Sequence, residues 1–200
     1  MKKLSLVFSY LLHPIFLPAL FMVFLLLTPY YMNDMLKPGA FRVLMLTLLV
    51  FTFFIPVFIL TIARMTGIID TFMLEKRSER IFALLITALA TYFAWRMFGS
   101  FDLPAYYSMF LIVFVLVLLL TSVINLFYKI SLHMVGWGAV TALMILYFLI
   151  FDLGISLMLI PVFLISGIAA WARLEQDAHT PAQVYAGFGV GLLALISYYF

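Results

Sequence analysis

The 200-residue chain has no cysteine, and only 10% of its residues are charged. The missing thiols exclude disulfide bonds, thiolate nucleophiles and cysteine-ligated metal sites. Soluble domains carry charge on roughly a quarter of their residues and have about 45–50% apolar residues. Here 68% of the residues are hydrophobic and the mean hydropathy is +1.26. A soluble domain of this size cannot bury so much apolar side chain. Disorder is excluded by the same composition, so lipid is the expected solvent.

Long apolar runs fill the sequence. A helix needs about 20 apolar residues to cross the hydrocarbon core of a bilayer. Open strands are excluded because backbone polar groups in lipid must be paired internally, and the continuous runs differ from the short alternating segments of a barrel. We therefore predict a single all-α domain over residues 1–200, a polytopic membrane bundle of about six to seven transmembrane helices. The seven candidate segments are residues 4–32, 41–65, 81–98, 105–128, 133–151, 154–172 and 184–200.

The first segment begins after Lys2 and Lys3 and so is similar to a signal peptide. No small-residue cleavage site follows promptly, so we expect a retained first span. Pro14 and Pro18 lie inside this span and are expected to kink it. Near the other end of the chain, Gly187 and Gly191 lie four positions apart, a spacing that predicts close approach to another helix.

Basic residues concentrate on one side of the predicted bundle. If the segments alternate in direction, eight of the eleven Lys and Arg residues fall on one side. Either these residues mark the cytoplasmic face, or some of them bind an anionic ligand. The same residues can serve both purposes, so the orientation of the chain in the membrane stays open. Nucleic acid is not an expected partner. The eight residues are Lys2, Lys3, Arg64, Lys76, Arg77, Arg80, Lys129 and Arg173.

Two polar motifs adjoin apolar segments. In one, Arg173 is followed six positions later by His179, and Gln183 lies four positions after that histidine. In the other, Ser131 and His133 stand at the start of the fifth segment. Both motifs fall at segment ends, and therefore near a membrane surface, on the same predicted side.

Together these motifs resemble two signatures of the type 2 phosphatidic acid phosphatase (PAP2) superfamily. The third signature reads Ser-Arg, five residues, His, three residues, Asp. Arg173 and His179 match it, with alanine in place of the serine and Gln183 in place of the aspartate. The second signature reads Pro-Ser-Gly-His. Ser131 and His133 match it, with isoleucine and leucine in place of the proline and glycine.

The first PAP2 signature, Lys, six residues, Arg-Pro, is matched only in its basic residues, Lys76 and Arg80. The resemblance spans roughly residues 76–191, and it identifies the chain as a divergent member with a PAP2-like core. It implies that His179 is a nucleophile forming a phosphohistidine and that His133 is the general acid. It also implies that Gln183 orients His179, without the charge an aspartate would supply. The implied phosphate-binding residues are Arg173, Ser131, Arg80 and Lys76.

The resemblance implies an integral-membrane phosphatase or phosphotransferase acting on a lipid phosphate or diphosphate, without metal or cofactor. The alternative is a catalytically inactive PAP2-like protein that binds lipid or serves as a structural subunit, so enzymatic activity stays open. A transporter lacks support because no inverted repeat and no deep acidic residue is found. The expected partners are membrane lipids, with a second copy or another membrane protein left open. The expected location is a bacterial inner membrane.

Each motif also has a purely structural interpretation. Arg173 and His179 can contact lipid headgroups, and Ser131 can cap a helix. The cluster from Lys76 to Arg80 can be a solvated loop that sets orientation. His13, beside Pro14, is either a hydrogen-bonded helix residue or part of a cavity lining.

Overall fold

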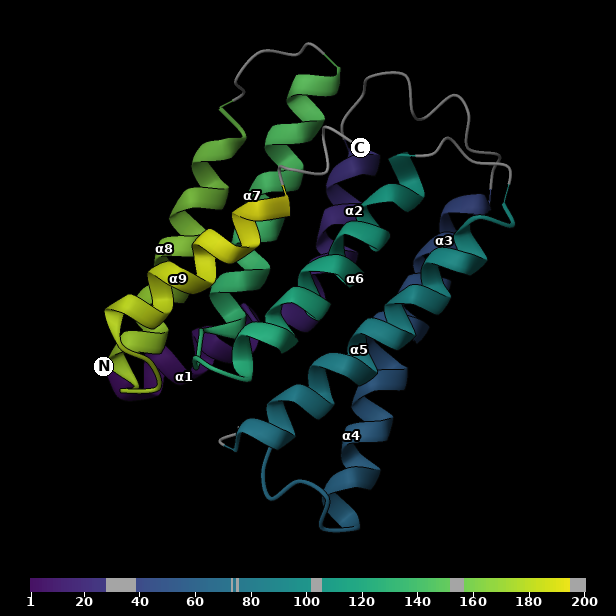
Figure 1. Ribbon diagram of the computed structural model, residues 1–200. Helices are drawn as coiled ribbons and strands as arrows, with labels where there is room; N and C mark the ends of the chain where they lie inside the picture. Colours follow the sequence, from purple (N-terminus) through teal and green to yellow (C-terminus); the bar gives the residue numbers. More distant parts are fainter. Residues whose placement is uncertain (28–38, 73, 75, 102–105, 152–156, 195–200) are drawn as a thin grey trace. The chain divides into compact units, whose positions relative to one another are not determined.

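The computed structural model describes residues 1–27, 39–72, 74, 76–101, 106–151 and 157–194, and within them every regular element is helical (Figure 1). This confirms the all-α prediction for the described part of the chain. The elements are α1 (Lys2–Leu11), the 3₁₀ turn η1 (Pro14–Phe16), α2 (Leu17–Leu27), α3 (Ala40–Leu49), the π-helical turn η2 (Val50–Phe54), α4 (Ile55–Met65), α5 (Arg77–Phe98), α6 (Tyr106–Asn125), α7 (Leu132–Ile150), α8 (Leu159–Glu175) and α9 (Pro181–Leu192).

Five helical stretches among the described residues are long and apolar enough to cross a membrane, which indicates a multi-pass membrane protein. The sixth predicted segment corresponds to α8, which has 17 residues, and the seventh to α9, which has 12. Parts of the predicted segments, at residues 28–32, 105, 154–156 and 195–200, lie outside the described residues. A count of six to seven spans therefore stays a prediction. The five stretches are Lys2–Leu25, Arg42–Met65, Arg77–Phe98, Ser108–Asn125 and Leu132–Ile150.

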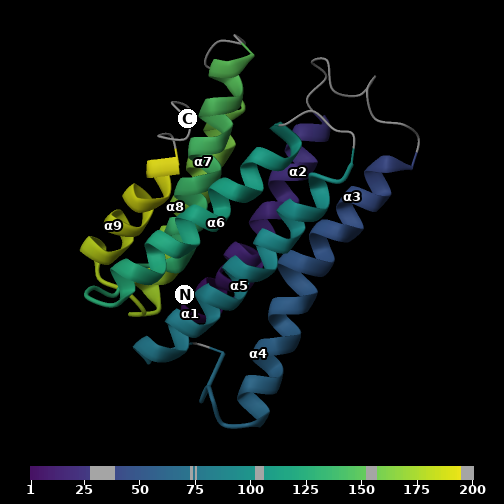
Figure 2. The same ribbon diagram turned by 45° about the vertical axis from the view of Figure 1, so that its right-hand side comes forward.

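The chain divides into two compact parts, one made of residues 1–17 and 127–200 and the other of residues 18–126. In the first part, most of α7 is buried, and it packs against α8, α9 and η1, while α1 packs against α8 (Figures 1 and 2). In the second part, α5 and α6 pair along their length, and α3, η2 and α4 pack against α5. Every predicted site residue of the third and second PAP2-like motifs lies in the first part.

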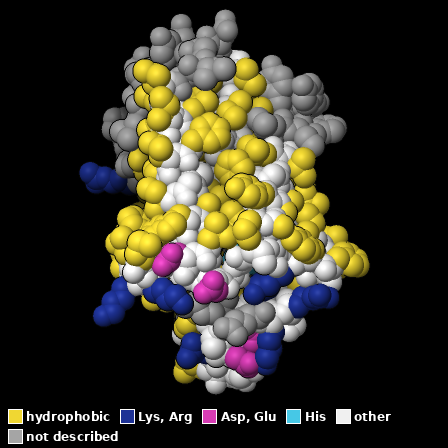
Figure 3. Space-filling model, turned by 90° about the vertical axis from the view of Figure 1, so that its left-hand side faces the viewer, with side chains coloured by type: hydrophobic (Ala, Val, Ile, Leu, Met, Phe, Trp, Pro, Cys, Tyr) yellow, Lys and Arg dark blue, Asp and Glu magenta, His cyan; other side chains and the backbone are white. Residues whose placement is uncertain are grey.

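Hydrophobic side chains cover a broad area of the face drawn in Figure 3. Exposed apolar residues of α8 include Ile160, Phe163, Leu164 and Ile168. An apolar face of this extent is unfavourable in water and suits contact with lipid tails. The distribution agrees with the apolar composition of the chain.

Glycine residues bring α7 and α9 into close contact. A Cβ atom added to Gly191 would lie 2.1 Å from the carbonyl oxygen of Val135, and one added to Gly138 would lie 2.2 Å from that of Phe188. At Gly187 the same atom would lie 2.6 Å from the carbonyl oxygen of Ser131. The close approach predicted from Gly187 and Gly191 is therefore confirmed.

Candidate functional site

The site begins where the first helix is interrupted. Pro14 has no N–H group, so it cannot donate to the last turn of α1. The N–H of His13 donates to the oxygen of Tyr10 instead of continuing the α-helical pattern, and the Nδ1 atom of His13 accepts from the N–H of Ile15 at 3.3 Å. The interruption predicted at Pro14 is thus confirmed, and it leaves main-chain oxygens of α1 available to other donors. Pro18 does not interrupt the chain in the same way, because it lies in the first turn of α2, where a backbone N–H is not needed.

Two side chains of α7 donate to these oxygens. Nε2 of His133 lies 3.0 Å from the main-chain oxygen of Ser9, and Nε1 of Trp137 lies 3.1 Å from that of Leu12. His133 and Trp137 are four residues apart, so they lie on the same face of α7. Because a carbonyl oxygen only accepts, the Nε2 atom of His133 must carry a proton.

The last turn of α8 contacts the same region of α1. Nη1 of Arg173 donates to Oγ of Ser9 at 3.3 Å and to Oε1 of Gln176 at 3.4 Å. Nε2 of Gln176 donates to Oγ of Ser9 at 2.7 Å and to the main-chain oxygen of Ser5 at 2.8 Å. Ser9, which is 7% exposed, therefore accepts hydrogen bonds from α7 through its carbonyl group and from α8 through its hydroxyl group.

The structure thus brings two predicted site residues, His133 and Arg173, to one residue of α1. The ring of His13 stands edge-on to that of His133, with 5.1 Å between the centroids.

Two residues of this cluster, Ser9 and Gln176, were not among the predicted site residues. A signal for Ser9 is present in the sequence: Ser5, Ser9 and His13 follow one another at intervals of four and so share a helix face. No comparable signal points to Gln176.

His179 lies in the short connection between α8 and α9. Thr180 caps α9 in a capping box, in which Oε1 of Gln183 accepts the N–H of Thr180 at 3.2 Å. The same Oε1 lies 3.0 Å from Nδ1 of His179. An amide oxygen is only an acceptor, so Nδ1 donates, and the neutral ring has its lone pair on Nε2. The contact expected between Gln183 and His179 is therefore present.

Oγ of Ser131, whose residue is fully buried, has no hydrogen-bond partner among the described residues. The buried Nε of Arg173 also has none. An unsatisfied buried donor costs about 1–3 kcal/mol, and native proteins contain few of them. Ser131 is the N-cap residue of α7 without a side-chain cap bond, and its N–H donates to the main-chain oxygen of Gln183. Both atoms belong to residues predicted to hold phosphate.

The other two predicted phosphate-binding residues, Lys76 and Arg80, belong to the second compact part. Nζ of Lys76 forms an ion pair with the carboxylate of Asp70, and this hydrogen bond raises the pKa of Lys76. The N–H of Asp70 in turn donates to Oε1 of the buried Glu79 at 2.8 Å. Arg80 is buried in the first turn of α5.

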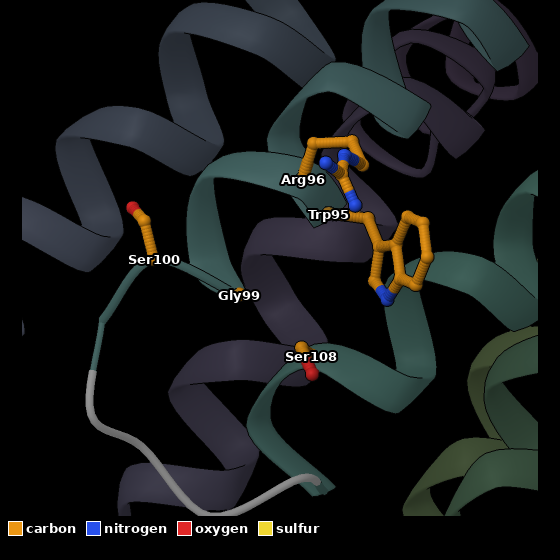
Figure 4. Close-up of a pocket in the computed structure, with 5 residues that line it drawn as sticks. All are labelled: Trp95, Arg96, Gly99, Ser100 and Ser108. Carbon is orange, nitrogen blue, oxygen red and sulfur yellow. The ribbon is translucent and has the colours of Figure 1, made fainter.

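A hollow of about 300 Å³ lies in the second compact part (Figure 4). Its lining does not include any predicted site residue. The guanidinium of Arg96 lies 5.9 Å from the ring centroid of Trp95, and the two side chains stand next to each other in Figure 4. The lining residues are Trp95, Arg96, Gly99, Ser100 and Ser108.

The described residues contain no group of three or more His, Asp or Glu side chains that could hold a metal ion. In comparisons with known proteins, no family model, no curated protein and no solved structure matches the chain. The resemblance to the PAP2 superfamily therefore depends on the motif residues themselves.

Proposed function

We propose that this protein is an integral-membrane phosphatase or phosphotransferase that acts on the phosphate group of a lipid phosphate or diphosphate. The observation that carries the proposal is the pair of buried donors without acceptors, Oγ of Ser131 and Nε of Arg173. They lie in the same compact part as His133 and His179. The oxygens of a phosphate group are strong acceptors, and a planar guanidinium group binds them with defined geometry.

The arrangement supports covalent catalysis by histidine. Nε2 of His179 attacks phosphorus, the bond from phosphorus to the lipid oxygen breaks, and a phosphohistidine forms. Nδ1 of His179 keeps its proton and donates it to Oε1 of Gln183 throughout. Arg173 and Ser131 donate hydrogen bonds to the phosphoryl oxygens, where negative charge accumulates. A water molecule or an acceptor hydroxyl group then takes the phosphoryl group from His179.

To protonate the leaving oxygen, the ring of His133 must be cationic, with a proton on each nitrogen. The leaving oxygen takes the proton from Nε2, the ring becomes neutral with its remaining proton on Nδ1, and Nε2 later accepts the proton of the attacking water. The Nε2 proton is donated to the oxygen of Ser9 in the structure, so His133 must exchange that acceptor for the leaving oxygen during the reaction. Gln183 orients His179 but does not neutralise the cationic ring of the intermediate, as a carboxylate would. We therefore expect turnover to be slow.

The test measures phosphate release by purified protein in detergent. The panel contains phosphatidate, phosphatidylglycerol phosphate, a polyprenyl diphosphate and lipid A. With ³²P-labelled substrate, the wild-type protein should carry label that is stable in alkali and lost in acid, as phosphohistidine is. His179→Ala should lose the label and reduce release by roughly 10³-fold or more, since a covalent nucleophile has no substitute.

Arg173→Ala should also reduce release strongly, whereas Arg42→Ala serves as its matched control. Arg42 is an exposed arginine near the start of α3, and its loss should leave release unchanged. Equal release by the wild-type protein and His179→Ala would remove the assigned nucleophile and with it the proposed mechanism.

A second candidate function is that of a catalytically inactive lipid-binding or structural subunit. It is favoured by the hydrogen bonds that His133 and Arg173 make to Ser9, because these bonds hold α1 against α7 and α8. In that case the wild-type protein releases no phosphate from any member of the panel and carries no alkali-stable label. Other membrane proteins would then be recovered with it after mild solubilisation, and His133→Ala would weaken the fold without affecting any turnover.

A further inference from the structure

The hydroxyl group of Ser9 holds one edge of the Arg173 guanidinium. Nη1 of Arg173 has two acceptors, Oγ of Ser9 at 3.3 Å and Oε1 of Gln176 at 3.4 Å, and both are uncharged. Gln176 is itself fixed, because its Nε2 donates to the same hydroxyl group and to the main-chain oxygen of Ser5. The guanidinium is therefore held in place by neutral groups, and within the described part of the chain it forms no ion pair.

Holding Nη1 also determines where the rest of the group lies. A guanidinium is planar and rigid, so fixing one nitrogen fixes the direction of the others. Nε of Arg173 is buried and has no acceptor among the described residues. A carboxylate at Nη1 would compete with an anion for the same charge, whereas a serine hydroxyl group and an amide oxygen orient the group without that competition.

We infer that Ser9, acting with Gln176, is a positioning residue that orients the Arg173 guanidinium toward an oxygen of a phosphate group. Helix α1 then contributes to the site through the side chain of Ser9. The identity of that anion rests on the proposed function, but the positioning of Arg173 does not. The role of the Ser9 hydroxyl group can be tested separately from that of the Ser9 main-chain oxygen. Its main-chain oxygen accepts from His133 whatever side chain is present, so Ser9→Ala removes only the contacts to α8.

The first experiment measures how fast phenylglyoxal modifies Arg173 in the detergent-solubilised full chain, with mass spectrometry to identify the modified residue. Ser9→Ala should raise this rate about fivefold, the factor expected for one lost hydrogen bond. Ser9→Thr, which keeps the hydroxyl group, should restore the slow rate. Ser166→Ala is the matched control, because Ser166 is a buried serine of α8 whose hydroxyl group donates to Val162 in its own helix.

The second experiment measures phosphate release from phosphatidate in mixed micelles. Arg173 contacts the phosphate in both the bound substrate and the transition state, so Ser9→Ala should raise KM and lower kcat/KM about fivefold, with a smaller change in kcat. Ser9→Thr should restore KM, and Ser166→Ala should leave it unchanged. If Ser9→Ala only destabilised the fold, a smaller fraction of the protein would be active and kcat would fall, whereas KM would stay constant.

The outcomes separate the inference from the proposed function. If Ser9→Ala exposes Arg173 to phenylglyoxal but the wild-type protein releases no phosphate, then the positioning role stands and the enzymatic proposal fails. If Arg173 reacts equally fast in the wild-type protein, Ser9→Ala and Ser166→Ala, then Ser9 does not hold the guanidinium and the inference is overturned. An active wild-type protein whose KM is unchanged in Ser9→Ala overturns it as well.

Discussion

Replacing Gly191 with alanine tests the contact between α7 and α9 on which the site depends. The added Cβ atom would lie 2.1 Å from the oxygen of Val135 and 2.6 Å from the nitrogen of Ala139. Both are backbone atoms of α7, so neither can rotate away. To restore an ordinary separation near 3.5 Å from the oxygen of Val135, α9 must move away from α7 by about 1.4 Å.

Overpacking of this kind costs about 1–3 kcal/mol, and the better helix propensity of alanine offsets up to ~1 kcal/mol of that. We therefore expect Gly191→Ala to lower the free energy of unfolding by about 1–2 kcal/mol. Gly189→Ala is the matched control, because Gly189 lies on the same helix and a Cβ atom there would have nothing within 4 Å. That variant should be neutral, or more stable by up to ~1 kcal/mol.

The measurement is unfolding in detergent, followed by circular dichroism during titration with sodium dodecyl sulfate and during heating. The two alanine variants should differ by about 2 kcal/mol, which is well resolved in a comparison of midpoints. Equal midpoints for Gly191→Ala and Gly189→Ala would show that α7 and α9 do not approach each other at Gly191, and the reasoning from this packing would be refuted.

Two further predictions concern single hydrogen-bonding groups. Trp137→Phe leaves the main-chain oxygen of Leu12 without its donor and should lower the free energy of unfolding by about 1 kcal/mol in the same assay. Trp171→Phe is its control, because Trp171 meets α1 through an edge-on ring contact with Phe8, and a smaller effect is expected. Ser131→Ala removes a buried hydroxyl group that has no acceptor, so it should stabilise the ligand-free protein by up to ~1 kcal/mol while lowering phosphate release. A destabilised Ser131→Ala protein would contradict the assignment of this hydroxyl group to a ligand.

The helices themselves were largely predictable from the sequence, since long apolar runs bounded by polar residues determine them. The segments predicted at residues 81–98 and 133–151 correspond to Arg77–Phe98 and Leu132–Ile150. The segment predicted at 41–65 is less regular, because the π-helical turn Val50–Phe54 separates α3 from α4 just before Pro56. Proline cannot donate a backbone hydrogen bond, which gives a physical cause for a local change in the helical hydrogen-bonding pattern there. The apolar periodicity of the sequence does not reveal that this change is a π-helical turn.

The candidate site was predictable only in part. Motif spacing indicated His133 and Arg173, which adjoin apolar segments, and His179, which lies in the polar stretch between two of them. It did not indicate that Ser9 would accept hydrogen bonds from residues 124, 164 and 167 positions away. A serine in an apolar helix usually donates its hydroxyl hydrogen to a main-chain oxygen of the same helix, as Ser5 does to Lys2. Only the tertiary packing distinguishes such a serine from Ser9, whose hydroxyl group accepts from residues far away in the sequence.

The break in the first helix explains why Ser9 can serve both α7 and α8. In a continuous α-helix the main-chain oxygen of Ser9 would accept the N–H of His13, four residues later. Because Pro14 interrupts the helix, that N–H bonds to Tyr10 and the oxygen of Ser9 accepts from His133. The hydroxyl group of Ser9 meanwhile accepts from Arg173. A proline in the first membrane segment therefore frees an acceptor for His133 on the same residue that contacts Arg173, although neither His133 nor Arg173 is near that proline in the sequence.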